Sequence, residues 1–223
     1  MAKLTWDATG NRFYETGLKM GVLYPYDSEK GTYGPGVAWN GLSSVSESPT
    51  GAEANAIYAD DIKYLNLYST EEFGATIEAY TYPDEWAECD GSAALAEGVM
   101  LGQQKRKLFG ICYRTVLGND TEADEYGYKL HLIYGCKASP SERQYQTIND
   151  SPEAITFSWE LSTTPVSAGD GYKAVSSITI DSTKADKTKL AALEAKLYGS
   201  DEEGSADPYM PLPEEIAKIF ATA

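Results

Sequence analysis

A strict alternation of apolar and polar residues is the feature that most constrains the fold of this chain. In residues 155–161, an apolar side chain occupies every second position from Ile155 to Leu161. Residues 73–80 and 128–134 repeat this period of two. Such a period places one set of side chains in a core and the other in water, as in a half-buried β-strand. Gly, Pro, Asn and Asp residues separate these runs, which predicts an antiparallel sheet.

The same patterns place eight strands and three helices along the chain. The predicted strands cover residues 18–24, 37–45, 62–68, 73–82, 108–117, 128–134, 155–162 and 174–180. A short helix is expected within residues 82–91, where Pro and acidic residues come first and Gly comes last. A second helix is expected at residues 186–198, because three leucines there fall on one face. A third helix should begin at Pro213, after a Gly-, Pro- and acid-rich linker at residues 200–213.

These elements predict a mainly β fold class. We expect an antiparallel sandwich or barrel-forming fold with a short flanking helix and a helical C-terminal extension. Residues 1–182 form the predicted β domain, and residues 183–223 form the predicted helical and flexible extension. All-β chains of this length commonly fold around one main core.

The charge balance limits the partners of the chain. It has 34 acidic and 18 basic residues, a formal net charge of −16, which disfavours a general grip on nucleic-acid phosphates. No apolar run approaches the roughly 18 residues that span a bilayer, and the start of the chain lacks a signal-peptide pattern. We therefore expect a cytoplasmic protein without membrane insertion. Cys89, Cys112 and Cys136 are widely spaced and odd in number, so we expect reduced thiols in the core.

The residues that catalysis or metal binding requires are sparse. A Ser–His–acid triad needs a histidine, and His131 is the single one, within a predicted strand. An ordinary strand position facing water or a neighbour is the favoured interpretation of it. Asp120, Glu122 and Asp124 alternate as in a calcium loop, but Glu125 stands where such a loop needs Gly. No enzyme activity, cofactor or metal is predicted.

Opposite charges concentrate in two separate stretches. Residues 47–90 contain eleven acids and one base, whereas Lys105, Arg106 and Lys107 form a basic stretch together with Arg114. Patches of opposite charge on one subunit can pair head to tail between identical subunits, which builds rings or helices. Two unrelated solvated surfaces explain the same pattern equally well.

Five stretches, in order along the chain, carry a resemblance to a known family. They are residues 36–49, 52–65, 72–86, 110–115 and 149–159. Over about residues 1–183, the chain resembles the major tail proteins, or tail tube proteins, of long-tailed bacteriophages that infect Gram-positive bacteria. The roughly 40 residues that follow depart from the resemblance.

The resemblance implies a structural subunit. In that family a β-sandwich joins its inner sheet to those of its neighbours, usually in hexameric rings that stack into a tube. The implied partners are further copies of the chain and the tape-measure, tail terminator and baseplate proteins. The implied location is a virion tail assembled in the host bacterial cytoplasm. Such channels are commonly acidic, and the charge of −16 fits DNA that passes in transit without specific binding.

The resemblance also implies an inter-subunit loop. In the family, a long loop between two early strands reaches neighbouring subunits and rings, and residues 47–61 match it. The candidate contact residues in this loop are Glu47, Glu53, Tyr58, Asp60 and Asp61. The candidate basic interface patch consists of Lys105, Arg106 and Lys107.

A non-catalytic β-sandwich that binds carbohydrate or a receptor is the alternative. In such a module, exposed aromatic residues such as Trp39 or Trp86 would stack on sugars. A core position for each tryptophan is the favoured interpretation.

Overall fold

The computed structural model describes residues 3–148, 150–151, 153–200 and 206–221. Within these residues the chain is mainly β and antiparallel, which confirms the predicted fold class. The strands are β1 Phe13–Asp27, β2 Thr32–Tyr33, β3 Val37–Ala38, β4 Leu42–Glu47, β5 Ala54–Ala59, β6 Ile62–Tyr68, β7 Gly74–Ala79, β8 Ala93–Ala96, β9 Val99–Leu101, β10 Phe109–Asn119, β11 Ala123–Ala138, β12 Phe157–Thr163 and β13 Ser177–Asp181. The helices are α1 Trp86–Asp90, α2 Lys187–Tyr198 and α3 Pro213–Phe220.

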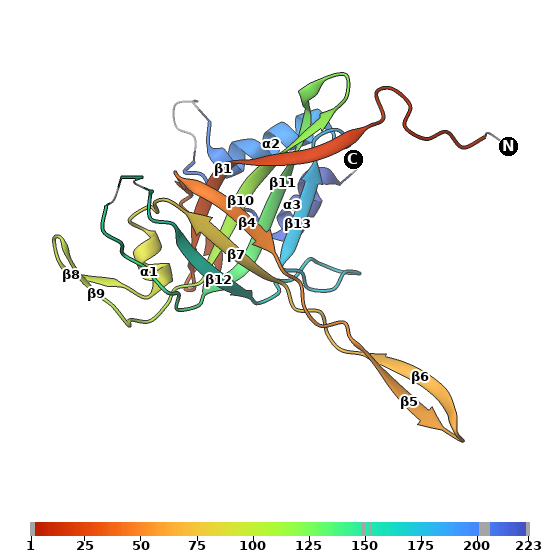
Figure 1. The fold of residues 1–223 in the computed structure, drawn as a ribbon, viewed down its shortest axis with the longest axis horizontal. Coiled ribbons are helices and arrows are strands. Elements are labelled where there is room, and N and C mark those ends of the chain that lie inside the picture. The colour runs from red at the N-terminus through yellow and green to blue at the C-terminus, as the bar shows by residue number, and fades with distance from the viewer. Residues whose placement is uncertain (1–2, 149, 152, 201–205, 222–223) are drawn as a thin grey trace.

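One sheet of nine strands forms the body of the molecule. Its strand order is β2-β1-β10-β11-β12-β7-β4, with β3 paired to β1 and β13 paired to β11. Residues 129–133 of β11 pair with β13, whereas residues 136–138 pair with β12. Because β11 changes partner along its length, the sheet turns there, and β12, β7 and β4 cross over β10 and β11 (Figure 1).

The first core lies between these two parts of the sheet. The alternation predicted for residues 73–80 is confirmed, since every second residue of β7 is buried, and in β12 Trp159 and Leu161 are buried whereas Ile155, before the strand, is exposed. Trp159 packs edge-on against Trp86 of α1, with ring centroids 5.1 Å apart. Trp39 joins them, and its ring centroid lies 4.7 Å from that of Trp86. The sandwich therefore closes around a cluster of aromatic rings.

The second core lies on the opposite face of β10 and β11, under α2 and α3. Leu190, Leu193 and Leu197 are buried there, as the helical spacing predicts. The Asp186 carboxylate caps α2 by accepting hydrogen bonds from the backbone N–H groups of Thr188 and Lys189, both at 3.0 Å. The two strands are thus covered on both faces.

The cysteines belong to these cores, as predicted. All three are free and buried: Cys89, Cys112 and Cys136. Burial raises the pKa of the Cys89 and Cys112 thiols to about 12 each. Thiols held neutral in this way contribute as small apolar side chains.

Some sequence-based expectations need correction. Residues 54–59, expected to be loop, form β5, and β8 and β9 form a further hairpin that the pattern did not predict. The strand expected at residues 37–45 is interrupted, since β3 ends before β4 begins. No described helix is both long and apolar enough to cross a bilayer.

The expected linker at residues 200–213 is only partly within the described residues, because residues 201–205 lie outside them. Met210, which lies beyond them, is buried and forms a bridge with Tyr33. A Cβ at Gly110 would lie 2.0 Å from the Met210 methyl carbon, so only Gly allows this close approach. Around Met210, the described part of this segment packs on the sheet, where a flexible linker was expected. The division between residues 1–182 and 183–223 stays a prediction.

Replacing Leu193 with Ala tests whether α2 belongs to the core. Leu193 is fully buried, so the substitution should lower the free energy of unfolding by about 2–5 kcal/mol through lost burial and a cavity. Lys187→Ala, at an exposed position of the same helix, should change it by less than about 0.5 kcal/mol. Urea unfolding measures both. Equal, small effects would show that α2 does not stabilise the sheet.

Candidate functional site

The hairpin of β5 and β6 projects away from the body as an arm (Figure 1). Asp60 and Asp61 form its two-residue turn, with φ angles of 51° and 61°. Two consecutive positive φ values are typical of the type I′ turn that joins twisted antiparallel strands, and Asp tolerates this conformation. The acidic pair therefore has a structural role at the tip of the arm.

Large apolar side chains lie on both faces of the arm, and the described part of the body does not pack against them. They are 38–69% exposed: Ile57, Tyr58, Ile62, Tyr64, Leu65, Leu67 and Tyr68. In the described part of the chain, β5 and β6 form a sheet only with each other. A lone two-stranded hairpin is at best marginally stable in water, and an apolar surface of this kind marks an interaction site.

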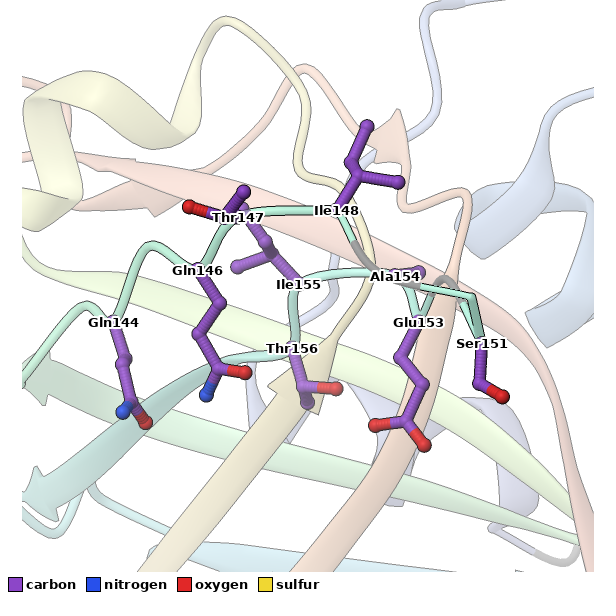
Figure 2. A pocket seen from close by; sticks show the side chains of 9 residues that line it. All are labelled: Gln144, Gln146, Thr147, Ile148, Ser151, Glu153, Ala154, Ile155 and Thr156. Atoms are coloured by element: carbon purple, nitrogen blue, oxygen red, sulfur yellow. The ribbon is translucent and has the colours of Figure 1, made fainter.

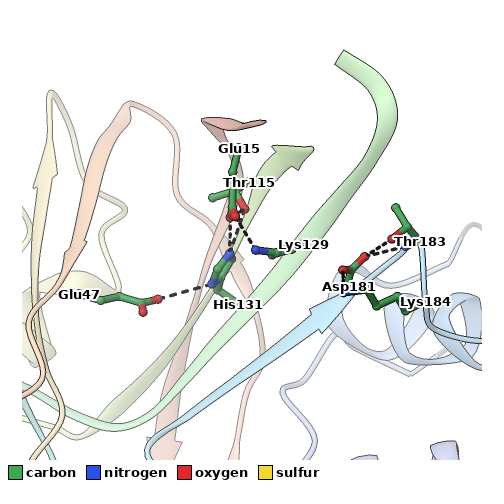
Figure 3. Close-up of polar contacts among 8 residues, drawn as sticks. All are labelled: Glu15, Glu47, Thr115, Lys129, His131, Asp181, Thr183 and Lys184. Atoms are coloured by element: carbon green, nitrogen blue, oxygen red, sulfur yellow. Dashed lines mark hydrogen bonds and ion pairs between the residues drawn. The ribbon is translucent and has the colours of Figure 1, made fainter. Parts of the chain in front are cut away.

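Glu47 joins this arm to the body. It is the last residue of β4, and its carboxylate accepts a 2.5 Å hydrogen bond from the Tyr113 hydroxyl of β10. The same carboxylate oxygen lies 3.5 Å from Nδ1 of His131 on β11, toward which Glu47 points (Figure 3). The rings of Tyr113 and His131 stack, with centroids 4.8 Å apart. Glu47 is therefore fixed by two neighbouring strands of the opposite sheet.

A polar cluster continues from His131 to β1. Nε2 of His131 lies 2.9 Å from Oγ1 of Thr115 and 3.6 Å from the Glu15 carboxylate. Glu15 also accepts hydrogen bonds from Thr115 and Lys129, both at 2.5 Å (Figure 3). The histidine side chain is only 13% exposed, so these contacts lie mostly out of water. His131 thus faces neighbouring polar groups, and four strands contribute to one network.

The order Thr115, His131, Glu47 follows the nucleophile, base and acid of a catalytic relay. The hydroxyl proton of Thr115, however, is donated to Glu15. The Thr115 oxygen can then only accept a hydrogen bond from His131, so His131 is not placed to take the proton of this hydroxyl. The geometry favours a structural role over nucleophilic catalysis.

Two carboxylates of the network have lowered pKa values. Contact with His131 lowers the pKa of Glu47, aided by the Tyr113 hydroxyl and opposed by burial. Burial raises the pKa of Glu15, but Lys129, Thr115 and His131 outweigh it and hold the pKa below its ordinary value. Burial and then Glu47 raise the pKa of the Tyr113 hydroxyl. Both carboxylates are held in their charged form.

One more acid lies near the network, on β13. Asp181 is opposite Lys129 in the register of β11 and β13. Its carboxylate accepts from the backbone and hydroxyl of Thr183 and pairs with Lys184 at 3.2 Å (Figure 3). These contacts outweigh burial and lower its pKa. The hydrogen bonds and the ion pair of Asp181 are thus made with residues of its own segment, at the edge of the network.

The structure places four of the five predicted loop residues on the arm and the fifth, Glu47, at its base. Tyr58, Asp60 and Asp61 lie on the hairpin, and the backbone N–H of Glu53, just before β5, donates to Oγ of Ser69 at 3.1 Å. Glu47 lies apart, within the body. Sequence reasoning missed its partner Tyr113, because 66 residues separate the two. The sequence placed Tyr113 in the strand predicted at residues 108–117 but did not say which strand would cover it.

The predicted basic patch is mostly engaged within the subunit. Lys107 pairs with Glu88 at 2.9 Å. Arg106 donates to the Ala138 carbonyl at 2.9 Å and lies 3.9 Å from Asp90. Lys105 is exposed. A contact of this patch with another subunit stays a prediction.

The acids of the supposed calcium loop hold the N-terminal segment. Asp120 accepts from the Gly10 backbone N–H at 2.9 Å, and Asp124 accepts from the Tyr14 hydroxyl at 2.8 Å. No group of three or more His, Cys, Asp or Glu among the described residues has metal-binding geometry.

A surface pocket of about 390 Å³ lies within the loop before β12. Figure 2 shows Gln144, Gln146 and Glu153 pointing to the same side of this loop. The nine described residues around the pocket all come from residues 144–156, so one folded loop makes it. Its amide and carboxylate groups provide hydrogen bonds without an arrangement of nucleophile and base.

The comparisons with known proteins give distant structural likenesses. No family model matches the sequence, and no curated protein shows significant similarity to it. A chain of the anti-feeding prophage baseplate aligns at 10% identity and a TM-score of 0.38, covering 81% of this chain and 99% of that one. A chain of the sheath–tube complex of an extracellular contractile injection system, in its extended state, aligns at 12% identity and 0.31, covering 79% and 93%. Because both TM-scores are below 0.5, neither likeness determines the function of this chain.

Replacing Glu47 with Gln tests the electrostatics of the network. A carboxylate whose pKa is lowered on folding stabilises the fold above its unfolded pKa and loses this effect as the pH falls through its folded pKa. The variant should be less stable near neutral pH, by under about 1 kcal/mol because the side chain is partly exposed. The difference from the unsubstituted protein should narrow as the pH drops below about 4.3.

Urea unfolding across the acid range measures this difference. Glu142→Gln, at an exposed position in the loop before β12, controls for the loss of one negative charge. A difference for Glu47→Gln that stays constant over the whole acid range would contradict the network's role.

Proposed function

We propose that this chain is a structural subunit of a phage tail tube that assembles with copies of itself into stacked rings. The observation that carries the proposal is the arm, whose apolar side chains on both faces have no cover in the subunit. A surface of this kind is stabilised when another protein covers it. The resemblance of residues 36–65 to tail tube proteins makes further copies of the chain the expected partner.

Open strand edges give a second reason for self-assembly. Among the described strands, β4 pairs only with β7, and β13 pairs only with β11. The other edge of each carries backbone groups that can bond to a strand of another chain. Joining such edges around a closed ring would extend the sheet from subunit to subunit.

The finer features of the proposal follow from the resemblance and the charge. We infer hexameric rings around an acidic channel that DNA passes without specific binding, since phosphates are repelled by a net charge of −16. The further partners would be tape-measure, tail terminator and baseplate proteins. The site of function would be the virion tail, with assembly in the host cytoplasm. The helices α2 and α3 would act as part of an extension that covers one face of the sheet.

The alternative of a carbohydrate-binding or receptor-binding module has less support. Trp39 and Trp86, the side chains expected to stack on sugars, are 4% and 0% exposed and belong to the first core. Buried indoles cannot offer their faces to a sugar ring.

Charge reversal at the tip of the arm tests the proposal. Changing Asp60 and Asp61 to Lys should impair tube formation and leave the thermal midpoint of the monomer nearly unchanged, because both residues lie outside the two cores. The matched control is Asp60→Asn with Asp61→Gly, which removes the charges and keeps residues suited to a type I′ turn.

Negative-stain microscopy at high protein concentration provides the measurement. Tubes or stacked rings from the unsubstituted protein, fewer from the Lys variant, are the expected result. A protein that stays monomeric and is retained on a sugar resin would contradict the proposal in favour of the binding module. Normal tubes from the Lys variant would exclude a contact role for the acidic pair.

A further inference from the structure

We propose that two anchors at the base of the arm set the direction in which the arm leaves the body: Glu47, hydrogen-bonded to Tyr113 and close to His131, and Thr163, hydrogen-bonded to Phe73. These are positioning residues, since they act through the arm and are not themselves on it. The importance of that direction for assembly rests on the proposed function. The effect of the anchors on that direction does not depend on the proposed function.

The first anchor holds the chain where it leaves β4. Glu47 accepts the Tyr113 hydroxyl at 2.5 Å and lies 3.5 Å from His131. Tyr113 is 3% exposed, so its hydroxyl bonds in a largely dry setting where a lost partner is costly. One end of the arm is thereby tied to β10 and β11.

The second anchor holds the chain where it returns to β7. Oγ1 of Thr163, the last residue of β12, donates to the backbone carbonyl of Phe73 at 2.6 Å. Phe73 directly precedes β7 and packs against the first core. The other end of the arm is thereby tied to β12.

Between the anchors and the hairpin lies a short stem. Ser48 donates to the Gly74 carbonyl, and Thr50 and Glu72 exchange backbone hydrogen bonds, all at 2.8 Å. Beyond it, Gly51 and Ala52 have φ angles of 84° and 53°, which bend the chain before β5. The stem holds the outgoing and returning segments of the chain together. It contains no core of its own that would fix their angle to the body.

Because the arm is long, a small change of its angle at the anchors moves its tip by a large distance. Stem and hairpin together extend for 12 residues from 48 to 59, about 40 Å at roughly 3.3 Å per residue. A tilt of about 10° at the base would move the tip by about 7 Å over that length. A displacement of that size exceeds the separation at which apolar side chains stay in contact, about 4.5 Å.

The test measures the arm on the monomer. Nitroxide labels at Tyr64→Cys on β6 and Lys137→Cys on β11 report the distance between arm and body by pulsed electron paramagnetic resonance. Both positions are exposed, whereas the three native cysteines are buried and escape labelling. The anchor variant combines Tyr113→Phe, which keeps the ring, with Thr163→Val, which keeps the shape. Thr163→Ser keeps the hydroxyl and is the conservative control.

We expect the anchor variant to broaden the distance distribution at least about twofold, while Thr163→Ser leaves it unchanged. In unlabelled protein, the critical concentration for tube assembly should rise about fivefold for each anchor bond lost, the equivalent of one hydrogen bond. An unchanged distribution in the anchor variant would overturn the inference. Equal broadening in Thr163→Ser would also overturn it, because the hydroxyl would then have no role.

The distribution separates this inference from the proposed function. If the protein forms no tubes and the anchor variant still broadens the distribution, the proposed function fails and the anchors stand. If tubes form normally and the anchor variant has the same distance distribution as the protein with intact anchors, the inference fails and the proposed function stands.

Discussion

Two strands with apolar side chains on both faces determine the architecture. Ile111 and Ile133 point into the sandwich, whereas Cys112, Leu130 and Leu132 point toward the helices. Neither face of β10 or β11 can remain in water without a large cost in free energy. The strands β4, β7 and β12 cover one face, and α2 and α3 cover the other. The helices α2 and α3 are therefore a structural part of the body.

The arm departs from this rule, and the departure is informative. Its large apolar side chains lie on both faces, as in a strand that is buried on both sides, yet both faces are open to water in the isolated subunit. Local hydrogen bonds and a well-formed turn keep the hairpin paired but give it no core. The body, with its two covered faces, provides a rigid base, and the network around Glu47 and His131 joins the two. A stable platform thus carries a surface suited to another chain.

Much of the body could be predicted from sequence because its signals are local. Alternation predicted β7 and β12, and the spacing of the leucines predicted α2. The failures came where distant contacts decide. Residues 54–59 fall in the stretch that the resemblance matched to a loop, and they form a strand because they pair with β6. Met210 packs because Gly110, a hundred residues earlier, leaves space for it.

The candidate site shows the same limit. The acids of the arm could be named from sequence, but their roles could not, since Asp60 and Asp61 form the turn while Glu47 belongs to the body. The basic stretch was recognisable as well, although Glu88 and Asp90 neutralise much of it within the subunit. A charge pattern shows where acidic and basic residues lie in the sequence. Only the fold shows which of them form ion pairs with one another.

Amide hydrogen exchange of residues 54–68, compared between monomer and assembled protein, tests the central claim most directly. If other copies of the chain cover the arm, its amides should exchange quickly in the monomer and become strongly protected on assembly, while those of β10 and β11 stay protected in both states. Assembly that leaves the exchange of the arm as fast as in the monomer would contradict this account.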